Sequence, residues 1–378
     1  MSAIYLHIPF CKRLCGYCDF FKSVKLQYLD AVLESMEREL VDEKGFLGDD
    51  AESQQIETIY FGGGTPSLIS PSQVKRFLDI ISDNYSTDAL CEVTIEVNPD
   101  DISLSYLTEL REAGVNRLSI GIQSFDDSEL KFMNRRHSSQ QAIDSVRMAQ
   151  SVGFDNITID LIFGVEGFGE DVLRHSIQVA LSLKVQHISA YHLTIEGGTQ
   201  FARKVEQGAM KVVSDEVSQA EYALLERELT TAGYEHYEVS NYALPNFRSR
   251  HNSSYWKGVK YLGIGPGAHA YNGSERRMAV DSIEKYLLGG DDRYEREKIY
   301  LIERFNELIM TSLRCCEGVD LLQLRAEFPA KFYDHIQKNG LIWLKEGRLI
   351  EGNGKIFIPT KYFLISDLII ESLFYTEV

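Results

Sequence analysis

The stretch IYLHIPFCKRLCGYC, residues 4–18, decides how this chain is interpreted. It begins as a short β-branched and aromatic run, typical of a buried strand, which Pro9 ends. Cys11, Cys15 and Cys18 then follow in a C-x3-C-x2-C pattern. Because six cysteines in 378 residues are too few for a disulfide framework, this crowding indicates a metal centre.

Similar short runs alternate with longer segments of helical spacing, the pattern of βα units around a parallel sheet. The six runs are Ile4–Ile8, Ile56–Phe61, Cys91–Val97, Arg117–Gln123, Asn156–Phe163 and His187–His192. Ser138 and Gln141 form a capping box that predicts a helix ending at Gly153. Periodicity leaves open whether the sheet closes into a partial barrel or stays doubly wound.

Beyond Leu193 the pattern changes to a long helix, residues 215–232, and then to a stretch up to residue 290 that we interpret as loop-rich. The cluster Gly-Gly-Asp-Asp at residues 289–292 predicts a boundary between a first domain, 1–290, and a second, 291–378. Helices and glycine turns in the second domain suit a small, mainly helical, winged-helix-like module. We interpret it as a lid or docking domain.

Composition limits the possible partners. A formal charge of −17 opposes binding to phosphate backbones, so we do not expect a nucleic-acid partner. The N-terminal residues MSAIYLHIPF lack the pattern of a signal peptide, and no apolar run reaches eighteen residues. We therefore expect a soluble cytoplasmic protein, for which the sequence leaves peripheral membrane contact open.

The three cysteines have a specific chemical interpretation. Three thiolates can hold three irons of a [4Fe-4S] cubane, which leaves the fourth iron free to chelate a small molecule. S-adenosylmethionine (SAM) is the molecule whose radical chemistry uses such a site. The alternatives are a structural zinc site with His7 as its fourth ligand, or ordinary buried thiols.

A second signal is the run Gly62-Gly63-Gly64-Thr65-Pro66 after the second strand, which lets backbone approach a ligand closely. Polar residues also lie at or near the ends of later strands, where ligands bind in parallel α/β folds. They are Glu96, Asn98, Gln123, Asp160, Tyr191 and His192. Arg135 and His137 could supply charge for a carboxylate. Each of these residues could singly be a cap or a hydrogen-bonded core group, but together they favour one shared site.

The chain resembles a known family along most of its length. The segments that carry the resemblance are YLHIPFCKRLCGYCDF, YFGGGTPSLI, IEVNPD, GVNRLSIGIQSF, DLIFGVEG, SAYHLTIEGGT, YEVSNYA, HNSSYW and YLGIGPGAHAY. Their order and spacing resemble the radical SAM family of oxygen-independent coproporphyrinogen III oxidases, and especially its branch of haem chaperones of the HemW type. Departures occur at GVEGFGED and at GGT after the sixth strand, which put the loop shapes there in doubt.

The resemblance implies an α/β fold, a partial (βα)6 radical SAM barrel, that holds a [4Fe-4S] cluster, SAM and haem. The implied SAM pocket is lined by Tyr5, Tyr17, Gly63, Gly64, Thr65, Glu96, Gln123, Arg135 and Asp160. It also implies that His251, in the HNSSYW segment, is an axial ligand of haem iron, with aromatic neighbours that cover the porphyrin.

Three features separate the chaperone branch from the true oxidase. The oxidase pattern resembles CxxxCxxCxC, and Phe20 occupies the position of its fourth cysteine here. The oxidase also carries a long segment before its cysteines. Finally, HNSSYW matches the HNxxYW motif of the chaperone branch. The resulting hypothesis is a protein that binds haem and passes it to acceptor proteins. The alternatives are a coproporphyrinogen III dehydrogenase that decarboxylates propionates, or a radical SAM enzyme that modifies tRNA or protein.

Overall fold

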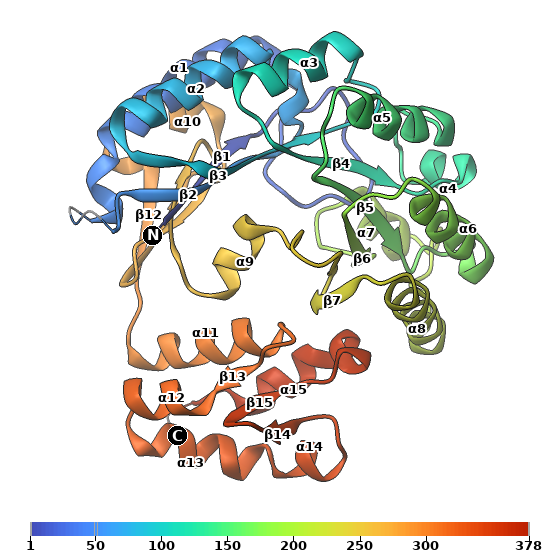
Figure 1. Ribbon diagram of the computed structural model, residues 1–378, viewed down its shortest axis with the longest axis vertical. Coiled ribbons are helices and arrows are strands. Elements are labelled where there is room, and N and C mark those ends of the chain that lie inside the picture. Colours follow the sequence, from blue (N-terminus) through green and yellow to red (C-terminus); the bar gives the residue numbers. More distant parts are fainter. Residues whose placement is uncertain (1, 49, 51, 377–378) are drawn as a thin grey trace.

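The computed structural model describes residues 2–48, 50 and 52–376. Its largest feature, within these residues, is one twelve-stranded sheet whose six central strands, β1 to β6, run parallel (Figure 1). These strands are Ser2–Ile8, Gln55–Gly63, Ser86–Val97, Arg117–Gln123, Ile157–Phe163 and His187–His192. The helices between them are α1 (Leu29–Asp42), α2 (Pro71–Asn84), α3 (Leu104–Ala113), α4 (Asp127–Phe132), α5 (Ser139–Ser151) and α6 (Gly169–Ser182).

The helices line the outer face of the curved sheet (Figure 1), so the predicted partial barrel is confirmed. All six expected strands are present, and the two at 117–123 and 187–192 have the expected bounds. The capping box at the start of α5 also forms, because Ser138 and Gln141 each bond the other's backbone. Gly153 follows α5 with a φ of +87°, which glycine adopts without strain.

The stretch expected to be loop-rich after α8 (Asp215–Thr231) is instead built largely of short strands. β7 (Glu235–Glu238) and β8 (Asn241–Ala243) extend the sheet beyond β6, while β9 (Lys260–Ile264) pairs with β1 in parallel. β10 (His269–Tyr271), β11 (Glu275–Ala279) and β12 (Tyr294–Lys298) continue from β9 as antiparallel neighbours. The prediction was wrong because strands of three to five residues are too short to display a period.

The boundary expected at residue 290 falls before the last strand of this sheet, since β12 still pairs with β11. The C-terminal module begins with α11 (Leu301–Leu313), after which a small antiparallel sheet in the order β13-β15-β14 packs with further helices. Its other elements are β13 (Val319–Asp320), α12 (Leu321–Glu327), α13 (Ala330–Asn339), α14 (Leu341–Lys345), β14 (Ile350–Gly352), β15 (Lys355–Phe357) and α15 (Ser366–Leu373). This arrangement agrees with the expected mainly helical module.

The described part of the barrel also contains three further short helices, α7 (Gln200–Glu206), α9 (Arg250–Trp256) and α10 (Ile283–Leu288). In Figure 1, α9 lies between the strands and α11, and it contacts both β2 and α11. In the part of the chain that the structure describes, no helix is long and apolar enough to cross a membrane.

A buried carboxylate joins α1 to the elements that follow β9. Glu39 has no exposed surface, and its oxygens accept hydrogen bonds from the Gly265 backbone N–H at 3.0 Å, from the Tyr286 hydroxyl and from the Tyr294 hydroxyl at 2.5 Å. Buried polar groups are stable only when they are paired in this way. Glu39 therefore fastens the late strands to the barrel.

Replacing Glu39 by Ala should lower the free energy of unfolding by about 3 to 5 kcal/mol, because two buried donors and the partly buried Tyr294 hydroxyl lose their acceptor. Chemical denaturation measures this loss. Glu34→Ala, on an exposed position of the same helix, is the matched control and should cost less than about 0.5 kcal/mol. Equal effects of the two substitutions would contradict the anchoring role of Glu39.

Candidate functional site

A pocket of about 440 Å³ lies at the carboxyl ends of the central strands. It brings together most of the residues singled out from the sequence. These are Cys11, Cys15, Tyr17, Cys18, Gly63, Gly64, Thr65, Glu96, Asn98, Gln123, Arg135, Asp160, Tyr191 and His192. The polar residues expected at the strand ends are thus brought together around one pocket.

The cysteine-bearing loop follows β1 and is closed by backbone hydrogen bonds at its base. The Cys11 N–H donates to the Ser23 carbonyl at 2.9 Å, and the Ser23 N–H donates to the Pro9 carbonyl at 2.6 Å. Farther along, the Gly16 carbonyl accepts from the Phe201 N–H at 2.9 Å. The loop is thereby held between β1 and the start of α7.

The glycine run after β2 permits the closest approach in the pocket. A Cβ on Gly64 would lie 2.8 Å from the Phe10 carbonyl oxygen and 3.0 Å from Cys11 Sγ. Gly63 has a φ of +112°, and a Cβ there would lie 2.8 Å from the His7 ring. Both positions therefore require glycine: a side chain at Gly64 would displace the cysteine loop, and one at Gly63 would meet His7 and adopt an unfavourable φ.

The pocket is lined by both acidic and basic side chains. Glu96 accepts hydrogen bonds from the Tyr60 hydroxyl at 2.8 Å and from the Gly63 N–H at 3.2 Å. Burial raises the pKa of Glu96 to about 7 and that of Asp160 to about 6. Arg135 donates to Asn98 Oδ1 at 2.7 Å and to Cys15 Sγ at 3.5 Å, while its Nε has no partner among the described residues. The pocket thus offers both a carboxylate and a cation to a zwitterionic ligand.

The donor set fits a [4Fe-4S] cluster, because three cysteines line the pocket beside an open glycine backbone. Zinc needs its sulfur ligands about 2.3 Å away around one point. Within residues 2–48, 50 and 52–376, no three Cys, His, Asp or Glu side chains are placed in that way. Cys11, Cys15 and Cys18 instead line the pocket together with the open glycine backbone. A larger cluster and a chelating ligand suit this arrangement.

Besides His7 and Gly62, three residues singled out from the sequence lie outside the pocket. Tyr5 is beneath it, with its ring 6.0 Å from that of Tyr60 and its hydroxyl 3.1 Å from His7 Nδ1. His137 is buried, with Nε2 at 3.0 Å from the Ile122 carbonyl, so it supplies no charge to a ligand in the pocket. His251, the third, lies deeper in the barrel.

His251 is only 1% exposed, and both of its ring nitrogens have partners. Nδ1 lies 2.8 Å from Thr58 Oγ1, and Nε2 lies 2.9 Å from the Tyr255 hydroxyl. The ring stacks on Tyr60 with the centroids 4.8 Å apart, and burial lowers its pKa to about 3. The neutral ring is the form that ligates metals, but coordination requires Tyr255 to release Nε2.

Two charged residues buried in the barrel, Glu92 and Arg117, were missed at the sequence level, and Glu92 positions α9. Glu92 accepts hydrogen bonds from the backbone N–H groups of Arg250 and His251, at 3.1 and 3.0 Å, and so holds the start of α9. Arg117 is buried inside the barrel and donates to Thr158. The available signal was a charge inside an otherwise apolar strand, at the even spacing that places Glu92 and Glu96 on one face.

The burial of His137 predicts a pH dependence of stability. Burial, and next the charge of Arg135, lower its pKa to about 3, whereas the unfolded chain binds the proton near pH 6.5. Stability is therefore lost as the pH falls below about 6.5. In His137→Gln, the loss of unfolding free energy between pH 7 and pH 5, measured by denaturation, should be about 2 kcal/mol smaller than in the wild type.

The exposed His175 on α6 provides the control for this experiment. His175→Gln should keep the wild-type difference between the two pH values. A His137→Gln variant with the wild-type difference would contradict a neutral, buried His137.

The sequence matches two known families. Residues 5–180 match the Radical SAM superfamily, and residues 300–361 match the HemN C-terminal domain. The heme chaperone HemW of Lactococcus lactis is 34% identical over 334 residues, which cover 88% of this chain and 86% of that protein. HemW of Bacillus subtilis is 37% identical over 289 residues, 76% of this chain and 75% of that protein.

A solved structure supports the fold independently. Coproporphyrinogen III oxidase (HemN) from Escherichia coli superposes with a TM-score of 0.84 at 22% identity, covering 99% of this chain and 90% of that one. At this identity the likeness concerns the fold alone. The sequence relatives, in contrast, are similar along most of their own length. The chain therefore belongs to the HemW family of radical SAM proteins.

Proposed function

We propose that this protein is a haem chaperone that binds haem and passes it to acceptor proteins in the cytoplasm. The observation that carries the proposal is the similarity to heme chaperones HemW at 34–37% identity over at least three quarters of the chain. The alternative, a coproporphyrinogen III dehydrogenase, is not favoured, because the oxidase of Escherichia coli is similar in fold at only 22% identity. Phe20, which occupies the position of the fourth cysteine in the oxidase pattern, lines the pocket and is 67% exposed.

Within this proposal, Cys11, Cys15 and Cys18 hold the [4Fe-4S] cluster. When bound, the cluster and SAM supply one-electron chemistry. The protein's own contribution is to fix the three thiols beside the glycine backbone and to keep the remaining side of the pocket polar. Thr65 Oγ1 donates a hydrogen bond to Cys11 Sγ at 3.5 Å and so helps to fix the position of that thiol.

SAM takes the remainder of the pocket in our proposal. Glu96, already bonded to the Gly63 N–H, accepts from the ligand's donors, and Arg135 faces its carboxylate. The members of the proposed set that line the pocket are Tyr17, Gly63, Gly64, Thr65, Glu96, Gln123, Arg135 and Asp160. Tyr5 belongs to this site only indirectly, because it packs below Tyr60, the hydrogen-bond donor to Glu96.

For haem iron we retain His251 as the proposed axial ligand, with one condition that its contacts impose. Its Nε2 must exchange the hydrogen bond to Tyr255 for the metal. The exchange is favourable when iron coordination outweighs that hydrogen bond, which contributes about 1 kcal/mol net. Tyr255 is thus expected to compete with iron for the ring.

Competition of this kind is testable with a matched pair of variants. His251→Ala should shift the haem absorption band and weaken haem retention, because the axial ligand is lost. Tyr255→Phe removes only the competing hydroxyl, so it should retain haem at least as well as the wild type. Cluster content and SAM binding should survive in both variants. A wild-type haem spectrum in His251→Ala would contradict the ligand role.

The function itself is tested by an anaerobic, side-by-side assay of the reconstituted wild type with haem and with coproporphyrinogen III. We expect retention of haem and its transfer to an apo-haem protein, with no formation of protoporphyrinogen IX. Multiple turnovers of coproporphyrinogen III would overturn the chaperone proposal in favour of the dehydrogenase.

A further inference from the structure

A second cavity, of about 900 Å³, lies between the barrel and the C-terminal module. We call it the interdomain cleft. One wall comes from α9, β9 and β10, and the other from α11 and α12. None of its lining residues also lines the pocket at the strand ends. The cleft is therefore a separate site on the other side of α9.

The barrel wall of the cleft is aromatic. Tyr255, Trp256, Tyr261 and Tyr271 all line it. The Tyr255 and Tyr261 rings meet edge to face at 4.7 Å, and the Tyr261 and Tyr271 centroids lie 6.3 Å apart. Aromatic rings in such arrays contribute broad apolar surface for a flat ligand.

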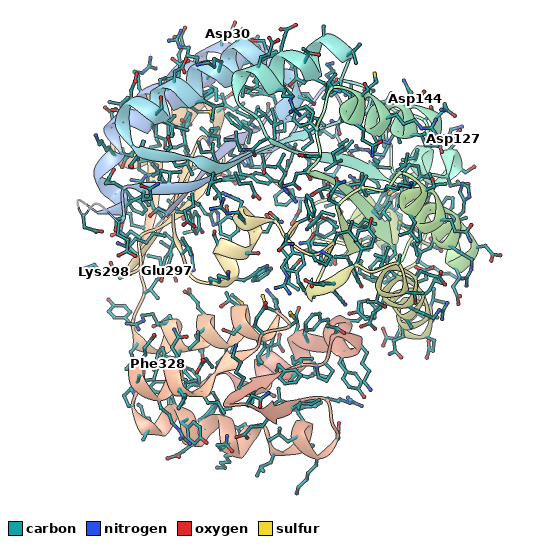
Figure 2. All side chains as sticks on the ribbon, viewed as in Figure 1. Asp30, Asp127, Asp144, Glu297, Lys298 and Phe328 are labelled. Atoms are coloured by element: carbon teal, nitrogen blue, oxygen red, sulfur yellow. The ribbon has the colours of Figure 1, made fainter. Side chains whose placement is uncertain are left out.

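The opposite wall carries both polar and apolar side chains. Leu308, Met310 and Phe328 line it, and Figure 2 labels Phe328 in the C-terminal module, below the strand that carries Glu297 and Lys298. Pockets of roughly 300–1,000 Å³ lined by apolar and aromatic side chains are typical of sites for organic cofactors. The cleft falls near the upper end of that range.

The cleft is lined by five cations and four glutamates, which leaves one positive charge in excess for an acidic ligand. Its four glutamates each face an arginine, in the pairs Glu57–Arg250, Glu307–Arg276, Glu317–Arg248 and Glu327–Arg304. Lys257 adds a fifth cation, which has no ion pair among the described residues. Two of the pairs, those of Arg250 and Arg304, are long, at 3.8 and 3.7 Å, and contribute little. Lys257, Arg250 and Arg304 are therefore the cations that a ligand carboxylate can contact, although the chain as a whole has a net charge of −17.

We propose that the interdomain cleft binds a flat aromatic macrocycle bearing carboxylates, which under the proposed function is haem. The macrocycle lies between the aromatic wall of the barrel and α11, and its carboxylates meet Lys257, Arg250 or Arg304. The pocket at the strand ends is the less suitable host, because a volume of about 440 Å³ is needed there for the cluster and SAM. Tyr255, which holds the Nε2 atom of His251, is itself a wall residue of the cleft.

The two tryptophans of the chain provide a matched pair of variants. Trp256 lines the cleft, whereas Trp343 donates to Ser372 within the C-terminal module and lies outside the cleft. In anaerobic titrations of the reconstituted protein with haem, Trp256→Ala should weaken binding about tenfold or more through lost aromatic contact. Trp343→Ala should remain within twofold of the wild type.

A second variant tests the space rather than the contact. Thr311 on α11 lines the cleft, so Thr311→Trp should fill it and also weaken haem binding at least tenfold. Metal-free protoporphyrin IX should lose affinity in parallel with haem in both cleft variants, because the proposed site recognises the macrocycle and its carboxylates. Iron content and SAM affinity, measured on the same samples, should equal those of the wild type and report intact folding.

The outcomes separate this inference from the proposed function on which it rests. A wild type that retains no haem would overturn the chaperone proposal itself. A wild type that retains haem, with unchanged affinity in folded Trp256→Ala and Thr311→Trp, would overturn the cleft alone. Loss of affinity confined to the two cleft variants supports the cleft.

Discussion

The rest of this structure depends on the close approach between the glycine run after β2 and the chain that leaves β1. The parallel register pairs His7 with Gly62 and Ile8 with Gly63, and the Gly64 N–H donates to the Ile8 carbonyl at 2.8 Å. Since a Cβ at Gly64 would meet both backbone and Cys11 Sγ, only glycine allows the cysteine loop to lie beside the second strand. This contact positions the cysteine loop at the carboxyl ends of the later strands. The loop can therefore face the polar side chains that lie at those strand ends.

Below that pocket, the barrel interior is filled by α9 rather than by strand side chains alone. Glu92 holds the first N–H groups of α9, and His251 stacks on Tyr60, whose hydroxyl donates to Glu96 in the pocket. On its other side α9 presents Tyr255 to the interdomain cleft. A short run of contacts therefore connects two cavities that share no lining residue. The HNSSYW segment thus fills part of the barrel interior and also lines the interdomain cleft.

The sequence predicted the central strands and the pocket well because both rest on local signals. Buried parallel strands read as apolar runs, and the topology of βα units carries their polar ends to one edge. The strands from β7 to β12 were missed because their short runs are stabilised by pairing with neighbouring strands, beginning with β8 on β6 and β9 on β1, which no local pattern encodes. The same limit applied to His251, whose motif predicted a ligand but whose partners, Thr58 and Tyr255, are set by the packing of α9.

The central claim is that Cys11, Cys15 and Cys18 would hold a [4Fe-4S] cluster with one iron free of protein ligands, in a pocket that the glycine run and Glu96 also line. It is tested most directly by electron paramagnetic resonance of the reduced, reconstituted protein with and without SAM, beside measured iron and sulfide. The account predicts four irons and four sulfides per chain, and a cluster signal that SAM changes. Ala at Cys11, Cys15 or Cys18 should abolish the cluster, whereas Ala at Cys91, Cys315 or Cys316, which lie outside the pocket, should not. A protein that holds one zinc, or a cluster signal indifferent to SAM, would contradict it.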